Sequence, residues 1–407
     1  MKKRIRPIIL AGGVGRRLLP LSTKSNPKQF LPIFKDLSLF DLTLQRVNNS
    51  LYKRPIIVTS TFYKKKVTES LERTGIRAKK VILEPESKNT LAAVCLATCF
   101  QSRNSQEESF IVLPSDHYFS NNKKFFQACE RALNNLTNNL VLFGIKPSHP
   151  STEFGYIKLS NDKSREVVSF IEKPDSIKAK KLFKSQEVYW NSGVSLFKGE
   201  WFTEEIKKIN NSFFNKIAAS LDQGKEDGLF YHVFSKIFEE LEDLSFDSAF
   251  VEKCKKISMF RLDAGWSDLG SWFALGSFET NKDTFYSLFR NKTHHKLNRP
   301  WGYFQVLKET KKSKVKLILV DSNQQLNLQK NKFRSETWHV IKGKAKVTSS
   351  KEKFTLETGD SISLKSNIIY SIENFKKTPL EIIAIQTEYP YKEGKIVRIK
   401  DRYGVID

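Results

Sequence analysis

Residues 5–17, IRPIILAGGVGRR, open the chain and decide its fold. Their first part, residues 5–11, is almost continuously apolar, which is typical of a β-strand buried on both faces, and glycines follow it directly. Further apolar runs of strand length, separated by polar or helical stretches, lie at residues 55–60, 80–83, 109–113 and 140–144. Strands that alternate with helices form βαβ units. We therefore predict an α/β domain with a mostly parallel sheet and helices on both faces.

The pattern changes at about residue 291, where short β-rich runs separated by glycines and polar turns begin. These runs lie at residues 315–320, 337–341, 345–348, 361–364 and 380–386. Such a series predicts a small all-β sandwich or barrel. We divide the chain into an α/β domain at residues 1–285, a linker at residues 286–298 and an all-β domain at residues 299–407.

The bulk composition narrows the classes of function. The 407 residues are 39% hydrophobic and 28% charged, which is typical of a folded chain, and no apolar run is long enough to span a bilayer. The net charge of +25 is compatible with a nucleic-acid partner, but lysines are spread along the chain and no nucleic-acid-binding motif occurs. We predict neither a nucleic-acid nor a membrane partner. The four cysteines form no C-x-x-C pair and no secretion signal precedes the first strand, so we expect reduced thiols and a cytoplasmic location.

The glycine-rich turn after the first strand is a candidate phosphate-binding loop. Gly12, Gly13 and Gly15 let the backbone approach an anion closely, and exposed N–H groups can then cradle it. Arg17 and Lys28 follow with positive charge. The turn lacks the third glycine of the dinucleotide-binding motif and the Gly-Lys-Ser/Thr of a Walker A loop. Glycine turns after strands are common, so this signal alone is weak.

Eight short motifs follow one another between residues 10 and 272. They are LAGGVGRR (10–17), NPKQF (26–30), EPESKNT (84–90), LPSDH (113–117), FGYI (154–157), FIEKP (170–174), WNSG (190–193) and GWSDLGSW (265–272). Together they resemble the sugar nucleotidyltransferase family, in particular its mannose-1-phosphate guanylyltransferase branch. The resemblance implies a Rossmann-like domain that joins GTP to mannose 1-phosphate, giving GDP-mannose and pyrophosphate.

The residue types suit an in-line attack of a sugar phosphate oxygen on the α-phosphorus of a nucleoside triphosphate. Both reactants are anions, so the protein must neutralise and align them. Mg²⁺ prefers oxygen ligands, and we expect Asp116 and Asp268 to hold it from two sides. Arg17 and Lys28 would hold the triphosphate, and Lys173 would hold the phosphate of the sugar. These three basic residues are the predicted catalytic groups.

The predicted binding residues form two groups. The nucleotide group is Leu10, Ala11, Gly12, Gly13, Gly15, Arg17, Lys28, Glu84, Pro85, Asn89, Thr90, Pro114 and Asp116. The sugar-phosphate group is Gly155, Tyr156, Glu172, Lys173, Asn191 and Asp268. Glu172 can accept hydrogen bonds from sugar hydroxyls, and Asn191 can both donate and accept. Some of these residues also have an ordinary structural interpretation. An aspartate at a strand end, such as Asp116, often caps a turn. Glu172 can be a surface ion-pair partner of Lys173.

Some residues depart from the family pattern and leave alternatives open. Arg16 stands where threonine or serine is usual, and Lys88 replaces an arginine, which removes a planar fork of donors. These departures lie beside the predicted nucleotide site and leave the choice of nucleotide open. The same fold with another NTP or hexose 1-phosphate is one alternative, and a non-catalytic regulatory homologue is another. A homodimer is compatible with either.

Three C-terminal motifs, RPWGY (299–303), LNLQ (326–329) and RSETW (334–338), resemble the cupin domain of type II mannose-6-phosphate isomerases. This resemblance implies a jelly-roll fold, and the family holds a divalent metal with histidines and a glutamate. Asn331, Phe333 and Tyr370 stand where the family has histidines, and only Glu336 remains. One carboxylate holds Zn²⁺ poorly. We therefore predict a cupin domain without its metal ligands and without isomerase activity.

Overall fold

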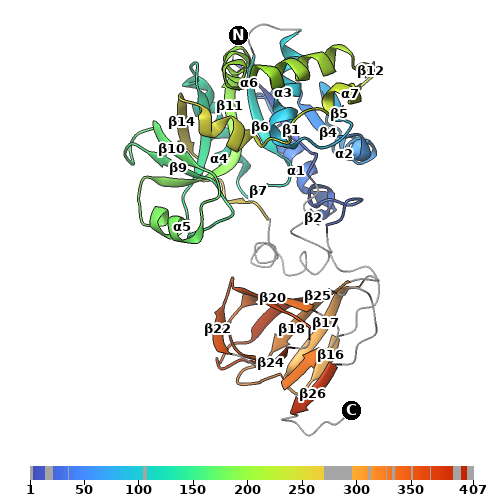
Figure 1. Ribbon diagram of the computed structural model, residues 1–407, viewed down its shortest axis with the longest axis vertical. Helices are drawn as coiled ribbons and strands as arrows, with labels where there is room; N and C mark the ends of the chain where they lie inside the picture. The colour runs from blue at the N-terminus through green and yellow to red at the C-terminus, as the bar shows by residue number, and fades with distance from the viewer. Residues whose placement is uncertain are drawn as a thin grey trace. The chain divides into compact units, whose positions relative to one another are not determined.

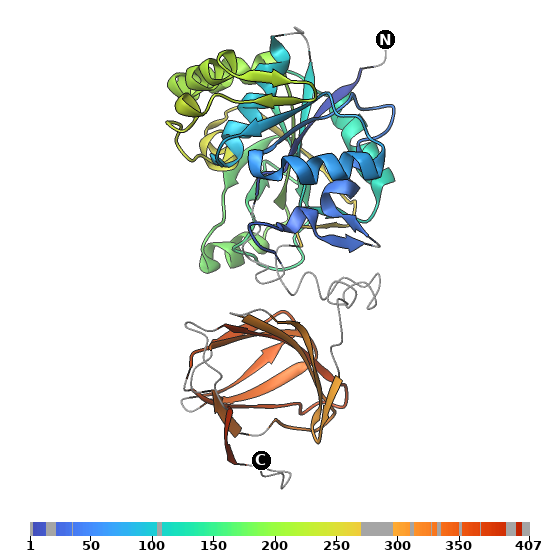
Figure 2. The ribbon, with the colours of Figure 1, turned by 90° about the vertical axis from the view of Figure 1, so that its right-hand side faces the viewer.

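The computed structural model describes residues 3–13, 22–34, 36–103, 108–269, 296–309, 313–326, 328–331, 335–349, 352–366, 368–387 and 396–400. The chain divides into two compact units (Figures 1 and 2). Among the described residues, no helix combines the length and the apolarity that crossing a membrane would require.

The first unit is built on one large mixed sheet whose centre is parallel, as predicted (Figure 1). Its strands are β1 (Ile5–Leu10), β4 (Ile56–Ser60), β5 (Lys80–Glu84), β6 (Ser109–Pro114), β8 (Leu140–Ile145), β9 (Tyr156–Leu159), β10 (Val167–Ile171), β11 (Val188–Lys198), β12 (Lys225–Asp227), β13 (Phe230–His232) and β14 (Ile257–Arg261). The order is β10-β9-β11-β6-β1-β4-β5-β13-β12, and β8 pairs with β11 and with β14. The long β11, which runs antiparallel to β6, β8 and β9, was not among the predicted strands.

Helices cover both faces of this sheet because the side chains of a strand alternate between its two faces. The helices are α1 (Leu39–Arg46), α2 (Lys64–Thr74), α3 (Asn89–Ser102), α4 (Asn122–Asn134), α5 (Ser176–Phe183), α6 (Gly199–Asp222), α7 (Ser235–Phe238) and α8 (Phe246–Ala249), with 3₁₀ turns η2 (Lys28–Phe30), η3 (Thr61–Tyr63) and η4 (Val251–Lys253). Ile8 of β1 lies in a core with α3 and α6, whereas Ile9 lies in a second core with α1, α2 and α4. The continuous apolar run of β1 thus serves two cores.

Four short strands between residues 22 and 269 lie outside the large sheet. They are β2 (Pro32–Phe34), β3 (Leu37–Ser38), β7 (Tyr118–Phe119) and β15 (Trp266–Ser267). After β3, Ser38 begins α1 with a capping box, in which its hydroxyl accepts from Asp41 N and the Asp41 carboxylate accepts from Ser38 N. β7 and β15 form a separate two-stranded ribbon, which Asp116 precedes and Asp268 follows in the sequence.

In the second unit, the described residues from 296 onward form antiparallel strands, as the jelly-roll prediction requires (Figure 2). They are β16 (Lys296–Arg299), β17 (Gly302–Glu309), β18 (Ser313–Val320), β19 (Leu328–Asn331), β20 (Ser335–Lys342), β21 (Lys344–Ser349), β22 (Lys353–Glu357), β23 (Ser361–Leu364), β24 (Ile369–Glu373), β25 (Leu380–Thr387) and β26 (Ile396–Lys400). One sheet has the order β16-β17-β18-β25-β20-β23 and the other β22-β21-β24-β19-β26. Trp338 and Ile382 from the first sheet share a core with Val347 and Tyr370 from the second, so the two sheets pack face to face.

Candidate functional site

The carboxyl ends of β1, β4, β5 and β6 meet at one edge of the sheet, because these neighbouring strands are parallel. The turn after β1 is held there by several hydrogen bonds. Ala11 N donates to Val58 O over 2.8 Å, and the Thr59 hydroxyl donates to Ala11 O over 2.9 Å. The Gln29 side chain donates to Ala11 O over 3.2 Å and to Gly13 O over 2.7 Å. Gln29, which was not a predicted site residue, therefore fixes the start of the glycine-rich turn.

The basic residues predicted at this turn are only partly described. Gly15, Arg16 and Arg17 lie outside the described residues, as does Trp272 of the last motif. Lys28 begins η2 and its side chain is buried, with 3% of the residue exposed. Burying an ammonium group costs free energy unless a charged or polar group faces it, so Lys28 is not an ordinary surface lysine.

Glu84 ends β5 with a buried carboxyl group. It is 3% exposed, and burial raises its pKa to about 8. Its Oε1 has no hydrogen-bond partner within the described part of the chain. A Cβ on Gly12 would lie 3.4 Å from Glu84 Oε2, so the carboxyl group stands beside the glycine-rich turn. A buried polar atom without a partner costs about 1–3 kcal/mol, which makes this group a candidate for binding a donor.

Four other residues of the EPESKNT motif, Glu86, Lys88, Asn89 and Thr90, have contacts within the protein. Asn89 begins α3 with a positive φ of 62°, and its side chain accepts from Thr90 N over 2.9 Å. The Thr90 hydroxyl accepts from Phe246 N over 2.8 Å and so anchors α8. Lys88, which stands where the family has an arginine, forms an ion pair of 2.8 Å with Glu86.

The ribbon of β7 and β15 carries the two predicted metal ligands. Trp266 pairs with Phe119 and Ser267 pairs with Tyr118 in antiparallel register. Asp116 lies two residues before Tyr118, and Asp268 directly follows Ser267. Both aspartates therefore leave the ribbon at the same end.

His117 joins this ribbon to β11. Its Nδ1 lies 3.0 Å from Ser192 O and 3.3 Å from Trp266 Nε1, so the same ring nitrogen has two possible hydrogen-bond partners. Ser192 O can accept only when Nδ1 is protonated, whereas the indole can donate only when it is not, so the tautomer decides which bond forms. Its Nε2 lies 3.8 Å from Asp116 Oδ1. The histidine thus orients the strand end that carries Asp116, in keeping with a structural role.

The predicted sugar-phosphate residues other than Asp268 lie on or next to β9, β10 and β11. Lys173 and Glu172 form an ion pair of 2.8 Å, and Lys173 has a positive φ of 39°, a backbone conformation that costs energy for a non-glycine residue. Asn191 N donates to Gly155 O over 2.7 Å. A Cβ on Gly155 would lie 2.7 Å from Glu172 Oε2 and 2.9 Å from Phe170 Cζ. Glycine is therefore required where β9 begins if Glu172 is to keep its position.

Tyr156 is the one residue of this group whose side chain lies in the core. It is fully buried, and its hydroxyl accepts from Ser151 N over 2.8 Å. Its ring packs with Val188 and Trp190, so the side chain contributes to the packing of this part of the sheet.

Asp247 belongs to this cluster, although it lies in none of the eight motifs. Asn191 Nδ2 donates to Asp247 Oδ1 over 2.8 Å. Burial, together with the nearby Glu172 carboxylate, raises the pKa of Asp247 to about 6, although the Lys173 ammonium and the Asn191 hydrogen bond lower it. The only signal in the sequence is an acidic residue inside the apolar segment FDSAF at residues 246–250.

The cupin position predicted to have lost its metal ligands is hydrogen bonded within the protein. Glu336 is 4% exposed, Trp338 Nε1 donates to its Oε2 over 2.9 Å, and Gln386 Nε2 donates to its Oε1 over 2.7 Å. The Tyr370 ring packs edge-to-face on Trp338 at 4.8 Å. Phe333 lies outside the described residues, and the Asn331 side chain is not described.

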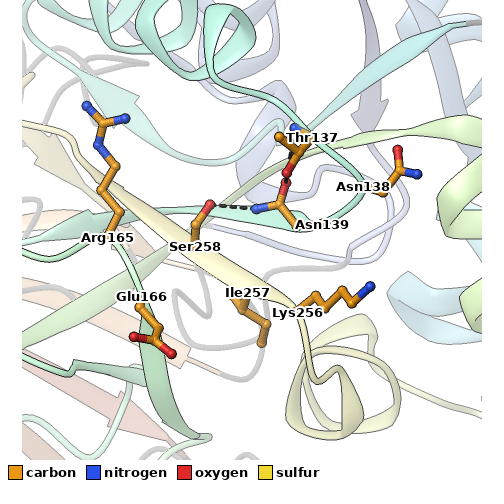
Figure 3. A pocket seen from close by; sticks show the side chains of 8 residues that line it. All are labelled: Thr137, Asn138, Asn139, Arg165, Glu166, Lys256, Ile257 and Ser258. Carbon is orange, nitrogen blue, oxygen red and sulfur yellow. Dashed lines mark hydrogen bonds between the residues drawn. The ribbon is translucent and has the colours of Figure 1, made fainter.

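A hollow of about 550 Å³ lies elsewhere in the first unit (Figure 3). Its lining includes the amino ends of the parallel strands β8 and β14, so it does not belong to the carboxyl edge of the sheet. Asn139 Nδ2 donates to Ser258 Oγ over 2.7 Å, while Arg165, Glu166 and Lys256 extend in different directions (Figure 3). Its charged groups do not converge on one point, and we assign it no ligand.

A parallel sheet that presents a glycine-rich turn, a buried carboxyl group and an aspartate-bearing ribbon at its carboxyl edge defines an α/β nucleotide-binding enzyme. Comparison with known proteins makes this class specific. The family model described as nucleotidyl transferase matches residues 6–284, and the model described as mannose-6-phosphate isomerase C-terminal matches residues 289–401. The chain belongs to the nucleotidyl transferase family, and it carries a C-terminal domain of the isomerase type.

Two curated relatives align with the chain over nearly their whole length. The xanthan biosynthesis protein XanB of Xanthomonas campestris is 31% identical, with 98% of each chain covered. The mannose-1-phosphate guanylyltransferase RfbM of Salmonella typhimurium is 29% identical, with 98% of this chain and 97% of that protein covered. A crystal structure of mannose-6-phosphate isomerase from Helicobacter pylori superposes with a TM-score of 0.58 at 31% identity, covering 65% of this chain and 99% of that one.

Proposed function

We propose that the chain transfers a guanylyl group from GTP to α-D-mannose 1-phosphate, giving GDP-mannose and pyrophosphate. The single observation that carries the choice of nucleotide is the buried Glu84 carboxyl group, whose Oε1 has no hydrogen-bond partner among the residues that the structure describes. The Watson–Crick edge of guanine offers two adjacent donors, N1–H and N2–H, which a carboxylate can accept together. Adenine and cytosine present an acceptor at the ring nitrogen of that edge. The name of the RfbM relative supports the same pair of substrates.

The proposed chemistry needs alignment and charge neutralisation and no covalent nucleophile. The attacking sugar phosphate is already ionised, so no general base is required, and His117 keeps its structural role. Lys28 would hold the triphosphate together with Arg17. Lys173, whose ammonium group lies 2.8 Å from Glu172, would hold the sugar phosphate. The positive charge of Arg17 and Lys28 would offset the negative charge that develops on the leaving pyrophosphate.

The residues present fit a divalent metal ion. Two carboxylates that leave one ribbon at the same end, together with phosphate oxygens, form the oxygen-rich donor set that Mg²⁺ prefers. Asp116 and Asp268 would hold it. When bound, Mg²⁺ polarises the phosphoryl group and neutralises developing charge. Across the described ranges, no three His, Cys, Asp or Glu side chains gather into a protein-only metal site, so substrate oxygens would have to complete the coordination.

The C-terminal domain is proposed to have no isomerase activity. The support is the pair of N–H donors, from Trp338 and Gln386, that occupy both oxygens of Glu336. We keep the domain boundaries at residues 1–285 and 299–407, with a linker between them.

A substrate panel tests the proposal. The purified full-length chain is incubated with Mg²⁺, one of five NTPs and one of several hexose 1-phosphates, and pyrophosphate release is followed. We expect GTP with mannose 1-phosphate to give the highest kcat/KM. A higher value for another pair would support the same fold with other substrates. Tight binding without turnover of any pair would indicate a regulatory homologue.

A further inference from the structure

Asp247 is held firmly although its helix, α8, is short. Phe246 N donates to the Thr90 hydroxyl over 2.8 Å, and the Phe246 ring packs with Phe202 at 6.1 Å. Phe250, at the other end of the segment, packs with Phe202 at 4.8 Å. Both aromatic neighbours point into the core, which leaves the Asp247 side chain directed to Asn191.

Asp247 stands in a charged cluster with Glu172 and Lys173. Asn191 Nδ2 occupies Asp247 Oδ1 at 2.8 Å, and Lys173 pairs with Glu172 at 2.8 Å. Glu252 Oε1 accepts from Glu172 N over 3.2 Å, which brings a third carboxylate close to this loop. One ammonium group does not neutralise these carboxylates. The carboxylates of Asp247 and Glu172 therefore favour neutral groups that donate hydrogen bonds, and a phosphate would lie on the side of the Lys173 ammonium group.

We propose that Asp247 is a specificity-determining residue, whose carboxylate accepts a hydrogen bond from a ring hydroxyl of the hexose while it also orients the Asn191 amide. With Glu172, it forms a pair of acceptors on the ring, and Lys173 takes the phosphate. This inference rests on the proposed function, because it names one further residue in the proposed sugar subsite. A hexose carries adjacent hydroxyl donors, and charged acceptors bind them more strongly than neutral ones do.

The test is a cycle of deoxy substrates and variants in the full-length chain. Wild type, Asp247→Ala and Asp247→Asn are assayed with mannose 1-phosphate and with its 2-, 3-, 4- and 6-deoxy analogues. Asp247→Asn keeps an acceptor for Asn191 and most of the shape, so it covers the case in which the alanine variant fails to fold. Asp243→Asn, an exposed aspartate before the same helix, is the matched control.

We expect Asp247→Ala to raise KM for mannose 1-phosphate by about 10- to 100-fold, the range for a hydrogen bond to a charged group, with KM for GTP unchanged. One deoxy analogue should lose a similar factor in the wild type and little further in the variant. Equal losses for all analogues in both proteins, or an unchanged KM, would overturn the inference. Absence of wild-type turnover with every substrate pair would instead overturn the proposed function.

Discussion

The indole nitrogen of Trp266 lies 3.3 Å from His117 Nδ1, although 149 positions separate the two residues in the sequence. This contact and the pairing of Ser267 with Tyr118 bring the last motif of the transferase domain against the middle one. The aspartates that flank the contact, Asp116 and Asp268, therefore have a fixed relationship that neither motif alone determines. The proposed metal site depends on it.

Replacing either aspartate by asparagine should abolish most of the metal-dependent rate. The amide keeps the shape but loses the negative charge, and metal stabilisation of a reacting phosphoryl group is worth several kcal/mol. We expect kcat to fall by about 100-fold or more in Asp116→Asn and in Asp268→Asn, with a higher Mg²⁺ requirement. Asp263→Asn, whose carboxylate is exposed and pairs with Lys124 at 2.8 Å, should keep the wild-type rate. Unchanged kinetics in either site variant would remove the catalytic assignment.

Glu84→Gln should weaken selection for GTP. An amide offers one acceptor and turns a donor toward guanine, so kcat/KM for GTP should fall by about 10- to 100-fold while the value for ATP changes little. Glu86→Gln, on the exposed side of the same loop, is the control.

GTP binding should also release a proton near neutral pH. The pKa of Glu84 is raised to about 8, and guanine donors favour the ionised form, so affinity should increase from pH 7 to pH 9. Calorimetry in two buffers with different ionisation enthalpies measures the proton. A pH-independent affinity would argue against Glu84 as the guanine acceptor.

The same group predicts how stability depends on pH. Between the ordinary value of 4.5 and the folded value of about 8, the folded chain holds the Glu84 proton and the unfolded chain does not. The free energy of unfolding from this group therefore falls as pH rises, by about 1.4 kcal/mol per unit, and levels off above pH 8. Glu84→Gln removes the effect. Its Tm should match the wild type near pH 4.5 and exceed it increasingly up to pH 8, and a constant difference would contradict the burial of this carboxyl group.

Gly155→Ala should damage the proposed sugar subsite while sparing the nucleotide. The added Cβ would lie 2.7 Å from Glu172 Oε2 and 2.9 Å from Phe170 Cζ, and an aromatic ring in a strand cannot move as easily as a carboxylate. We expect a roughly tenfold rise in KM for mannose 1-phosphate and a loss of about 1–3 kcal/mol in stability. Steady-state kinetics with each substrate varied separately show the difference. A larger effect on GTP than on the sugar would indicate that Gly155 serves another part of the site.

Short sequence patterns predict the strands and turns whose residues are neighbours in the sequence. The apolar run of β1 and the glycines after it mark a buried parallel strand and its turn, since both signals lie within a few residues. Asp247 could not be found this way, because its importance comes from a hydrogen bond to Asn191, 56 residues away. Gln29 was missed for the same reason, since its amide reaches back to Ala11 and Gly13. The FGYI motif predicts a sugar-phosphate role for Tyr156, and the motif could not indicate that its ring packs with Val188 and Trp190, which lie more than 30 positions away.

The C-terminal domain offers a prediction about stability and metal content. The Glu336 carboxylate accepts from two N–H groups, and glutamine has only one acceptor oxygen, so Glu336→Gln would place an amide NH₂ against Trp338 Nε1 or Gln386 Nε2. Leaving one buried donor without a partner should lower the free energy of unfolding of this domain by about 1–3 kcal/mol. Glu352→Gln, at an exposed turn, should have no effect.

If Glu336 instead held a metal, the Glu336→Gln variant would lose stoichiometric zinc or cobalt and any interconversion of mannose 6-phosphate with fructose 6-phosphate. Elemental analysis and that assay, on both variants, distinguish a hydrogen-bonded core from a working metal site.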